Sequence, residues 1–460
     1  MKIVIAGAGA VGSHLARMLS KDNQNVILMD GDESRLSRLG NELDIMTLTK
    51  QPTSIQGLKD AEVNHADLFI AVTPNESENL TCAMLAKQLG AKKSVARVDN
   101  YEYMKPENLK LFKEMGIESL IYPELLAAED IAASARYSWV RQLWEFNNGE
   151  LLLLSVRMHD AHPVSGKAVT NAENQLVGHT LKEIGMKHGH NFHVVAIKRD
   201  GETVSPHGDE KILSNDLVFF MTTKENLAHI RHLTGKDDYP AVNHSLIIGG
   251  GKLSVRASWK LADIHNSVKI IEPNLERIEQ LHSLVAPKTM ILEGEGYDMD
   301  LLNDEGYDNM DALIALTSND QQNILACVAA RRRGVRKTIA QVENLDYFDM
   351  ADDLDIGTII NKKMIAASHI YRMLLKGDVD NVKMLTIGKA DVAEFVVKTG
   401  SKVTKKPVME LNFPLGINIG GMSRDGKSML VGGRTQLQAG DKVVVFCINN
   451  TLKKLDRFFK

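Results

Sequence analysis

A glycine-rich loop near the start of the chain has the composition of a phosphate-binding turn. Gly7-Ala8-Gly9-Ala10-Val11-Gly12 follows a short apolar run, Lys2–Ala6, and precedes a segment with helical spacing. In this G-x-G-x-x-G pattern the first glycine makes the tight turn, the second lets a pyrophosphate approach the backbone, and the third lets helix and strand pack closely. The free N–H groups at the start of the helix then face the phosphates. The pattern predicts a nucleotide site; the alternative is a glycine turn kept only for packing.

An acidic residue stands where such a site needs one. Asp30 ends the second apolar run, Asn25–Asp30, about 20 residues beyond the loop. A carboxylate at that place can accept hydrogen bonds from both ribose hydroxyls and disfavours a 2′-phosphate. NAD(H) is therefore favoured over NADP(H).

Two further positions of the first half are candidate contacts. Thr73 and Pro74 follow the apolar run that starts at Asp67, at the carboxyl edge where parallel sheets bind ligands. The alternative for this segment is a helix N-cap. Arg97 lies in the next apolar run, and it either meets a phosphate or forms a surface ion pair.

The same features recur in the second half of the chain. Residues 311–323 repeat the pattern of residues 67–79, and the spacing persists from Gly90 to Gly334. A second correspondence joins the Arg-Asp-Gly triplets at 199–201 and 424–426. The chain is therefore predicted to hold two copies of a two-part unit.

The second glycine cluster is less regular than the first. Ser254 stands where the third glycine is expected, and Gln341 stands where the first copy has Arg97. The second copy is thus either another nucleotide site or a degenerate repeat kept as scaffold. Its candidate contacts are Gly249, Gly250, Gly251, Lys252, Leu253, Glu272, Thr317 and Ser318.

Apolar runs alternate with helical segments in the first part of each copy, which indicates an α/β fold. We predict two tandem copies of a doubly wound parallel, Rossmann-like lobe, each followed by a small α+β module. The predicted parts are a first nucleotide-binding lobe (1–123), a crossover helix or linker (124–149), a first small module (150–230), a second nucleotide-binding lobe (241–361), a second crossover helix (362–376) and a second small module (382–458). The segment Pro123–Phe146 is interpreted as helical, with Trp139 and Trp144 favouring a subunit interface over a core position.

Composition and charge narrow the class of protein. The chain has 460 residues, 44% hydrophobic and 25% charged, which is ordinary for soluble domains. The net charge of -4 gives no basic surplus for nucleic acid, so no such partner is expected. Three scattered cysteines are typical of a reducing compartment. No apolar run approaches the ~18 residues of a membrane helix, so we expect a soluble, intracellular protein.

The sequence offers no strong catalytic pattern. No Ser/His/Asp or Cys/His constellation is evident, and nothing nominates a proton donor beside a nicotinamide. His188, His190 and His193 lack zinc-site spacing and are interpreted as solvated loop histidines. Arg331-Arg332-Arg333 ends a predicted helix and complements its dipole. A sensor is favoured over an enzyme; the alternative is an NAD-dependent dehydrogenase of unknown substrate. A redox-responsive transcription factor would need a helix-turn-helix and a basic face, and neither is found.

Taken together, these segments resemble a known family. The glycine loop with Asp30, the run Ala71–Glu76, Ala96-Arg97-Val98 and the segment Ala196–Gly201 resemble RCK/KTN domains. Two of them in tandem, spanning essentially the whole chain, are similar to the cytosolic regulatory subunits of Trk-type potassium uptake systems. The combination is specific, whereas the glycine motif alone would not be.

The resemblance implies a non-enzymatic cytoplasmic protein, peripheral on the inner face of the cell membrane, that gates a membrane-embedded potassium-translocating subunit. It implies NAD(H), or adenine nucleotides such as ATP and ADP, as ligands. It also implies a homo-oligomer assembled through the crossover helices, four chains forming an eight-lobe ring. The nucleotide contacts carried over by the resemblance are Gly7 to Val11, Asp30, Thr73, Pro74 and Arg97 in the first copy, and Gly249 to Leu253, Glu272, Thr317 and Ser318 in the second.

Overall fold

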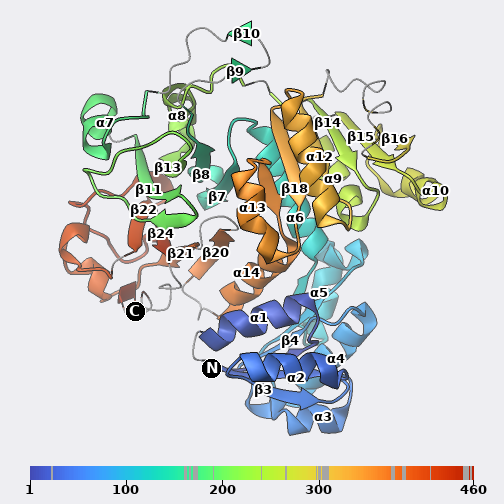
Figure 1. Ribbon diagram of the computed structural model, residues 1–460. Helices are drawn as coiled ribbons and strands as arrows, with labels where there is room; N and C mark the ends of the chain where they lie inside the picture. Colours follow the sequence, from blue (N-terminus) through green and yellow to red (C-terminus); the bar gives the residue numbers. More distant parts are fainter. Residues whose placement is uncertain are drawn as a thin grey trace. The chain divides into compact units, whose positions relative to one another are not determined.

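The computed structural model divides the chain into two compact units, Met1–Leu126 with Lys362–Leu375, and Ala127–Asn361 with Lys376–Lys460. It describes residues 1–21, 24–159, 175–189, 191–239, 241–264, 267–296, 310–374, 379–385, 390–414 and 416–448, with a few isolated positions between them (Figure 1).

The first unit contains a parallel sheet with its connecting helices, and we call this part of the chain lobe one. Its strands are β1 (Lys2–Ala6), β2 (Asn25–Asp30), β3 (Met46–Thr49), β4 (Leu68–Ala71), β5 (Ser94–Arg97) and β6 (Ser119–Ile121), in the order β3-β2-β1-β4-β5-β6. The strand order reverses between β1 and β4, so their carboxyl ends flank the point where doubly wound sheets bind ligands. Ile3, Val4 and Ile5 are fully buried, as expected for a strand covered on both faces.

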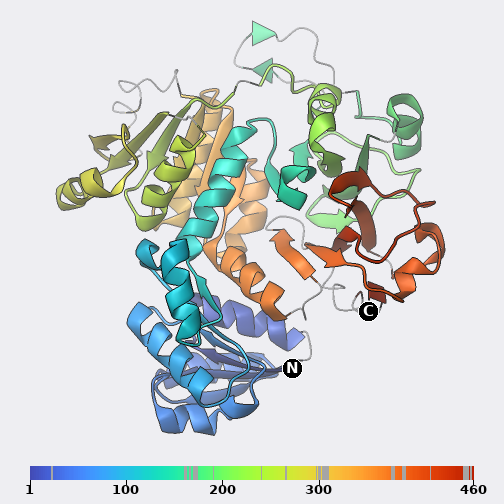
Figure 2. The same ribbon diagram turned by 180° about the vertical axis from the view of Figure 1, so that it is seen from behind.

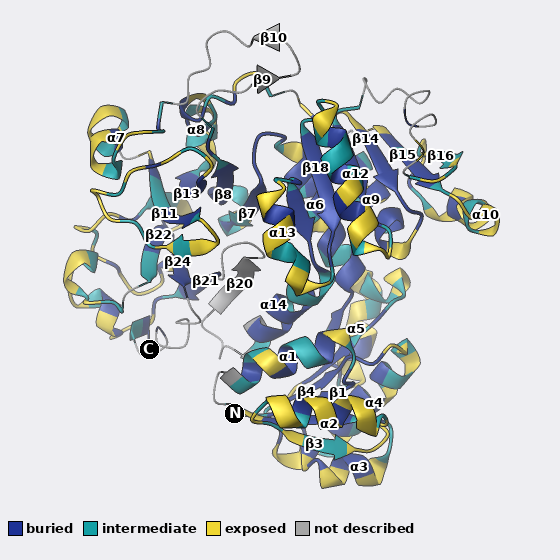
Figure 3. Cartoon of the chain, in the orientation of Figure 1, coloured by how far each residue is buried: buried dark blue, intermediate teal, exposed yellow. Residues whose placement is uncertain are grey.

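Helices connect these strands. They are α1 (Ala10–Lys21), α2 (Glu33–Glu42), α3 (Ile55–Asp60), α4 (Glu76–Gln88) and α5 (Pro106–Glu114), with 3-10 turns at Val63–His65 and Tyr101–Met104. Asp32, Ser54 and Asn75 cap α2, α3 and α4 through side-chain oxygens, which fixes where these helices begin. The strands of the sheet form the dark interior of this lobe in Figure 3.

The second unit contains the matching sheet, lobe two. Its strands are β14 (His244–Ile248), β15 (Ser267–Glu272), β16 (Met290–Glu293), β17 (Ala312–Ala315), β18 (Lys337–Gln341) and β19 (Thr358–Ile360), in the order β16-β15-β14-β17-β18-β19. Its helices are α9 (Lys252–Ala262), α10 (Leu275–Leu284), α12 (Asp320–Arg332) and α13 (Phe348–Asp353), with a 3-10 turn at Leu345–Tyr347. Both lobes therefore have the predicted doubly wound parallel topology.

The two crossover helices are exchanged between the lobes. Helix α14 (Lys362–Leu374) follows lobe two in sequence but belongs to the first unit, where it packs against α1. Helix α6 (Pro123–Arg136) follows lobe one, yet the unit boundary falls inside it and its second half belongs to the second unit. There Ser134 Oγ lies 2.8 Å from Thr358 Oγ1 of β19, and Glu129 pairs with Lys260 of α9 at 3.0 Å. Figure 2 shows this second half of α6 lying over lobe two.

The second unit also contains two small antiparallel sheets. The sheet of module one comprises β7 (Gln142–Phe146), β8 (Leu151–Arg157), β11 (Phe192–Arg199), β12 (Glu202–Val204) and β13 (Leu217–Thr223), in the order β12-β11-β13-β8-β7. Its helices are α7 (Leu181–His188) and α8 (Leu227–Leu233), and it has 3-10 turns at Asn147–Gly149 and Lys224–Asn226. A separate short pair consists of β9 (Pro163–Val164) and β10 (Lys167–Ala168). Module two comprises β20 (Val379–Leu385), β21 (Ala390–Val396), β22 (Ile417–Arg424), β23 (Lys427–Leu430) and β24 (Lys442–Ile448), in the order β20-β21-β24-β22-β23, with 3-10 turns at Lys402–Thr404 and Val408–Glu410. Read from β12 to β7 in module one and from β23 to β20 in module two, the two orders match strand for strand. The internal repeat and the predicted fold class are therefore confirmed.

Each module contains one hairpin closed by an Arg-Asp-Gly turn. Asp200 and Gly201 have φ of 49° and 80°, and Asp425 and Gly426 have 51° and 78°, the positive values that a tight hairpin turn requires. Arg199 forms a bidentate pair with Asp216 at 2.8 and 2.7 Å, and Arg424 forms the same pair with Asp441. These repeated triplets therefore have a structural role.

The expectation of a helix across Pro123–Phe146 is wrong beyond Arg136. Residues 142–146 form β7, which pairs antiparallel with β8. Trp139 and Trp144 are each only 6% exposed and lie in the core of the second unit, where Trp144 stacks near Phe219. The interpretation of the tryptophans as an interface is therefore also wrong. The Asn-Asn-Gly turn at 147–149 returns the chain onto the apolar strand β8, and that pairing overrides the local helical pattern.

Candidate nucleotide-binding sites

The glycine loop of lobe one is closed on one side and open on the other. Gly7 has φ of +109°, and a Cβ placed there would lie 2.8 Å from the backbone nitrogen of Thr73. A Cβ at Gly12 would lie 1.9 Å from the carbonyl oxygen of Gly7, so only glycine fits under the loop. A Cβ at Gly9 would meet nothing within 4 Å. The second glycine thus faces the space through which a phosphate would approach the backbone.

Asp30 ties this loop to the end of β2. Its carboxylate accepts hydrogen bonds from Ala8 N at 2.6 Å and from Asp32 N at 2.9 Å. A carboxylate has about four acceptor positions, so about two remain for other donors. Asp30 is half-buried at the edge of the sheet, which leaves those positions accessible to a ribose.

A buried asparagine fixes the adjacent strand ends, and the sequence-based prediction missed it. Asn79 of α4 is 1% exposed. Its Oδ1 accepts from Thr73 N at 2.8 Å, and its Nδ2 donates at 3.0 Å to the carbonyl oxygens of Thr73 and Arg97. It therefore holds the ends of β4 and β5 together under the candidate site. The signal was present, because an asparagine closes both copies of the repeated segment.

Arg97 pairs with an acid in this structure. Its Nη2 lies 3.4 Å from Asp99 Oδ1, while its Nε is buried without a hydrogen-bond partner. Pro74, next to Thr73, is exposed. These residues lie at the carboxyl edge of the sheet with the glycine loop.

Lobe two repeats this framework. Gly249 has φ of +95°, and Glu272 accepts from Gly250 N at 2.6 Å and from Asn274 N at 3.0 Å. Asn323, fully buried, accepts from Thr317 N at 3.0 Å and donates to the carbonyl oxygens of Thr317 and Gln341 at 3.0 and 2.9 Å. The polar scaffold of the site is thus duplicated bond for bond.

A pocket of about 610 Å³ opens beside the glycine loop of lobe two, within the range of small-molecule sites. The loop residues Gly249 to Gly251, Glu272, Thr317 and Ser318 line it, and apolar side chains of β14, β15, β17 and α12 form much of the rest. Helix α9 begins directly after the loop with Lys252 and Leu253 and has no side-chain cap, so its first amides face a prospective anion without a competing side-chain acceptor.

The glycine loops of the two lobes differ at two positions. A Cβ at Gly250 would lie 2.9 Å from Glu272 Oε2, whereas the matching residue of lobe one is Ala8 beside the shorter Asp30. Such a Cβ would also lie 2.6 Å from Leu281 Cδ1, so Leu281 and Glu272 together favour glycine at this position. Ser254 replaces the third glycine, is fully buried, and has no hydrogen-bond partner for its Oγ. Lobe two thus accommodates a side chain that the tighter loop of lobe one would exclude.

Other sequence candidates do not form a second centre. Among the described residues, no group of three or more His, Cys, Asp or Glu side chains could hold a metal ion, and His190 lies outside them. His188 packs near His229, and burial lowers its pKa. Burial raises the pKa of the buried thiols Cys82 and Cys327 to about 12. Within the described part of the chain, no helix has the length and apolarity needed to cross a bilayer.

Fold and site define a class: tandem dinucleotide-binding lobes, each with a glycine loop closed by a strand-end carboxylate. The TrkA-N domain model matches residues 3–123 and 245–362, and the TrkA-C domain model matches 168–235 and 392–460. The chain belongs to the TrkA family defined by these domains.

Curated relatives match the chain in sequence over nearly their whole length. The chain is 27% identical over 462 residues to a Trk system potassium uptake protein TrkA homolog of Archaeoglobus fulgidus, covering 100% of both. It is 29% identical over 455 residues to Trk system potassium uptake protein TrkA of Vibrio alginolyticus, covering 98% of this chain and 96% of the relative.

Solved structures share the fold. The GsuK channel bound to NAD superposes with a TM-score of 0.60 at 17% identity, covering 100% of this chain and 78% of the other. GsuK bound to ADP superposes with a TM-score of 0.50 at 12% identity, covering 81% and 69%.

Proposed function

We propose that this chain is the cytosolic regulatory subunit of a Trk-type potassium uptake system. It binds NAD(H) or an adenine nucleotide and gates a membrane-embedded potassium-translocating subunit through a ligand-dependent change of conformation. The observation that carries the proposal is the duplicated glycine loop, closed by a carboxylate, in a chain whose full-length relatives are named potassium uptake proteins.

The geometry supports a specific division of roles in each lobe. The open side of Gly9 or Gly251 admits the pyrophosphate, and the start of α1 or α9 offers backbone N–H groups to it. Asp30 or Glu272 accepts hydrogen bonds from the ribose and disfavours a 2′-phosphate. The strand ends at Thr73–Pro74 and Thr317–Ser318 border the rest of the ligand, and Arg97 adds a cation in lobe one. The GsuK structures bound to NAD and to ADP favour these two ligand types.

A dehydrogenase is the alternative, and the pocket of lobe two disfavours it. Among the described residues that line this pocket there is no histidine, lysine, tyrosine or cysteine; its acidic side chains are Glu272, which is engaged with the amides of Gly250 and Asn274, and Glu295, which follows β16. A hydride-transfer enzyme needs a positioned proton donor or acceptor beside the reacting carbon. Binding without turnover is the better fit.

Regulation requires that the nucleotide prefer one conformation over another, because a ligand shifts an equilibrium only by its differential affinity. A coupling free energy of about 1–3 kcal/mol per site is usual. We propose that four chains assemble through the crossover helices into an eight-lobe ring, peripheral on the inner face of the membrane. In such a ring, the small differences in nucleotide affinity between the two conformations would add over several lobes.

The decisive experiment identifies what the purified protein carries and whether it reacts. Mass spectrometry of the nucleotides released on denaturation, followed by calorimetric titration of the emptied protein, should give saturable binding of NAD(H), ATP or ADP. Potassium uptake by cells lacking the protein should be restored by the wild type and depend on Asp30 and Glu272. Protein-dependent steady oxidation of NADH, or absence of binding to both lobes, would refute the proposal; monomers in light scattering would refute the ring.

A further inference from the structure

A small pocket lined by cations lies inside the second unit, between module one and lobe two. Its volume is about 40 Å³. One side is formed by residues 138–141 with Arg157, His159, Lys236 and Tyr239, and the other by Arg331, residues 336–338, Asp355, Gly357 and Thr358. The lysines and arginines that line it are Arg141, Arg157, Lys236, Arg331, Arg336 and Lys337, and the only carboxylate among the described lining residues is Asp355.

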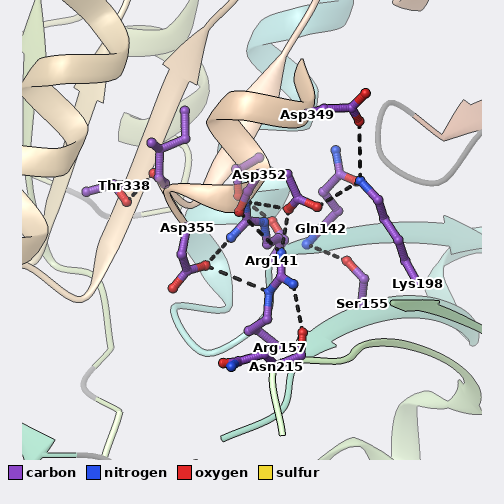
Figure 4. A network of polar contacts seen from close by, with 12 residues as sticks. Arg141, Gln142, Ser155, Arg157, Lys198, Asn215, Thr338, Asp349, Asp352 and Asp355 are labelled. Atoms are coloured by element: carbon purple, nitrogen blue, oxygen red, sulfur yellow. Dashed lines mark hydrogen bonds and ion pairs between the residues drawn. The ribbon is translucent and has the colours of Figure 1, made fainter. Parts of the chain in front are cut away.

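Two aspartates next to this pocket are already shared among several cations (Figure 4). Asp352 Oδ1 accepts from Arg141 Nη2 at 2.9 Å and from Arg157 Nη2 at 2.5 Å, and its Oδ2 accepts from Lys198 Nζ at 2.8 Å. Asp355 accepts from Arg141 Nη1 and, at 2.5 Å, from Arg331 Nη2. With Asp349, which lies 3.8 Å from Lys198 Nζ, three carboxylates face the four cations Arg141, Arg157, Lys198 and Arg331, so the cluster keeps an excess of positive charge even before Arg336 and Lys337 are considered.

Donors in the cluster lack acceptors. The side chain of Arg141 is 4% exposed, and its Nε has no hydrogen-bond partner. The Nε of Arg157 is also buried without one. A buried donor without an acceptor costs about 1–3 kcal/mol, and more when the group is charged. Both arginines line the pocket, so an acceptor bound there lies beside two guanidinium groups that each have an unsatisfied Nε–H.

The pKa values of Lys236 and Lys337, which line the pocket, are both lowered. Burial lowers the pKa of Lys337 to about 7, and Arg141 and Arg331 lower it further. Burial also lowers the pKa of Lys236 to about 7, with Asp355 opposing and Arg331 and Arg336 adding to the effect. Both are thus about half-protonated at neutral pH. His159, the remaining titratable lining group, has its pKa lowered by burial to about 4 and stays neutral.

The matching positions of lobe one show no such cluster. Through the internal repeat, Arg336 and Lys337 correspond to Lys92 and Lys93, and Arg331 corresponds to Lys87. The side chain of Lys92 is 72% exposed and pairs with Asp67 at 2.7 Å. Lys92 and Lys93 are exposed, whereas Arg336 is half-buried and Lys337 is 3% exposed; Arg331 and Lys87 are both half-buried. Lys337 is buried together with Arg141 and Lys236, so these cations need acceptors, and Val140 O, 2.7 Å from Lys337 Nζ, supplies one of them.

We propose that this pocket binds one small divalent oxyanion of the phosphate or sulfate type, which joins module one to lobe two. Guanidinium and ammonium groups are the usual partners of tetrahedral oxyanions, because they offer charge and several donors at once. The pocket is far below the volumes of nucleotide sites, so the ligand is a single anion rather than a second NAD. The site is separate from the glycine loops, and the proposal does not depend on their function.

The test uses the full-length protein freed of nucleotide. Unfolding temperature is measured against sulfate and phosphate, with sodium chloride keeping the ionic strength constant. Because a ligand that binds only the folded state stabilises it, sulfate should raise the unfolding temperature saturably. Sulfate does not titrate near neutral pH. Its calorimetric titration at pH 7.5 in two buffers of different ionisation enthalpy should therefore show proton uptake by the two lysines.

Matched variants separate this pocket from general charge effects. Arg336→Gln and Lys337→Met should each weaken sulfate binding about tenfold or more, since each removes a charged donor. Arg332→Gln removes the same charge from an exposed residue outside the pocket lining and should leave binding unchanged. If Lys337→Met does not fold, Arg336→Gln decides.

Three results would overturn the proposal. One is no stabilisation by sulfate or phosphate beyond that of chloride. Another is undiminished binding in Arg336→Gln, which would place the anion elsewhere, such as the glycine loops. The third is an equal loss of binding in Arg336→Gln and Arg332→Gln, which would mean that binding follows net charge and not this pocket. If phosphate raises the unfolding temperature and sulfate does not, the ligand is phosphate alone. Proton uptake on binding is then corrected for the protons that phosphate itself gains or loses near neutral pH.

Discussion

The buried amide of Asn79 offers a sharp test of how the candidate site is held. Replacing it with alanine removes three hydrogen bonds and leaves the Thr73 N–H and the carbonyl oxygens of Thr73 and Arg97 without that partner. Each net bond contributes about 1 kcal/mol, and each buried group left unpaired costs about 1–3 kcal/mol. We expect Asn79→Ala to lower the free energy of local opening by about 3–5 kcal/mol.

Hydrogen exchange measured by mass spectrometry on the full chain suits this prediction, because the two-unit protein need not unfold in one step. The backbone amides of β4 and β5 should exchange about 10²-fold to several thousandfold faster in Asn79→Ala, since 1.4 kcal/mol corresponds to a factor of ten. Nucleotide affinity should fall as well, because the Thr73 edge is released.

Asn75→Ala is the matched control. Asn75 lies on the same helix as its exposed N-cap and accepts one bond, from Glu78 N at 3.1 Å, so its loss should cost only about 1 kcal/mol. If Asn79→Ala costs no more than Asn75→Ala, the amide is not what holds the two strand ends together, and the reasoning fails.

Further predictions concern binding, folding and reactivity. Asp30→Ala should weaken nucleotide binding by about 2–3 kcal/mol and Glu272→Ala by less; calorimetry in which the second variant loses the tighter phase would reverse this ranking. Trp144→Ala should destabilise the second unit by about 3–5 kcal/mol in urea unfolding, and an altered mass in light scattering with unchanged stability would contradict its core position. Since burial raises the pKa of Cys82 and Cys327 to about 12, iodoacetamide at pH 8 should modify them only in unfolded protein, as peptide mapping would show.

Much of the fold follows from local sequence. Strands β1 and β2 coincide with their predicted runs, because a buried parallel strand is marked by continuous apolar residues between turn residues. The glycine loop was recognisable for a similar reason: its spacing reflects steric limits at Gly7 and Gly12 that no side chain can satisfy. The internal repeat then carried the prediction into the second half. The roles of the individual site residues remain predictions.

Only the tertiary structure decided which distant segments meet. The helix expected through Trp144 became a strand because β8 offered a pairing partner, and Asn79 acquired its role because two strand ends lie within reach of one amide. The exchange of α6 and α14 between the lobes and the burial of Lys337 among arginines are likewise contacts between residues far apart in sequence. Local patterns record which face of an element is apolar, but not which element covers it. The free energy of burial and of charge compensation is therefore fixed only when the chain has folded.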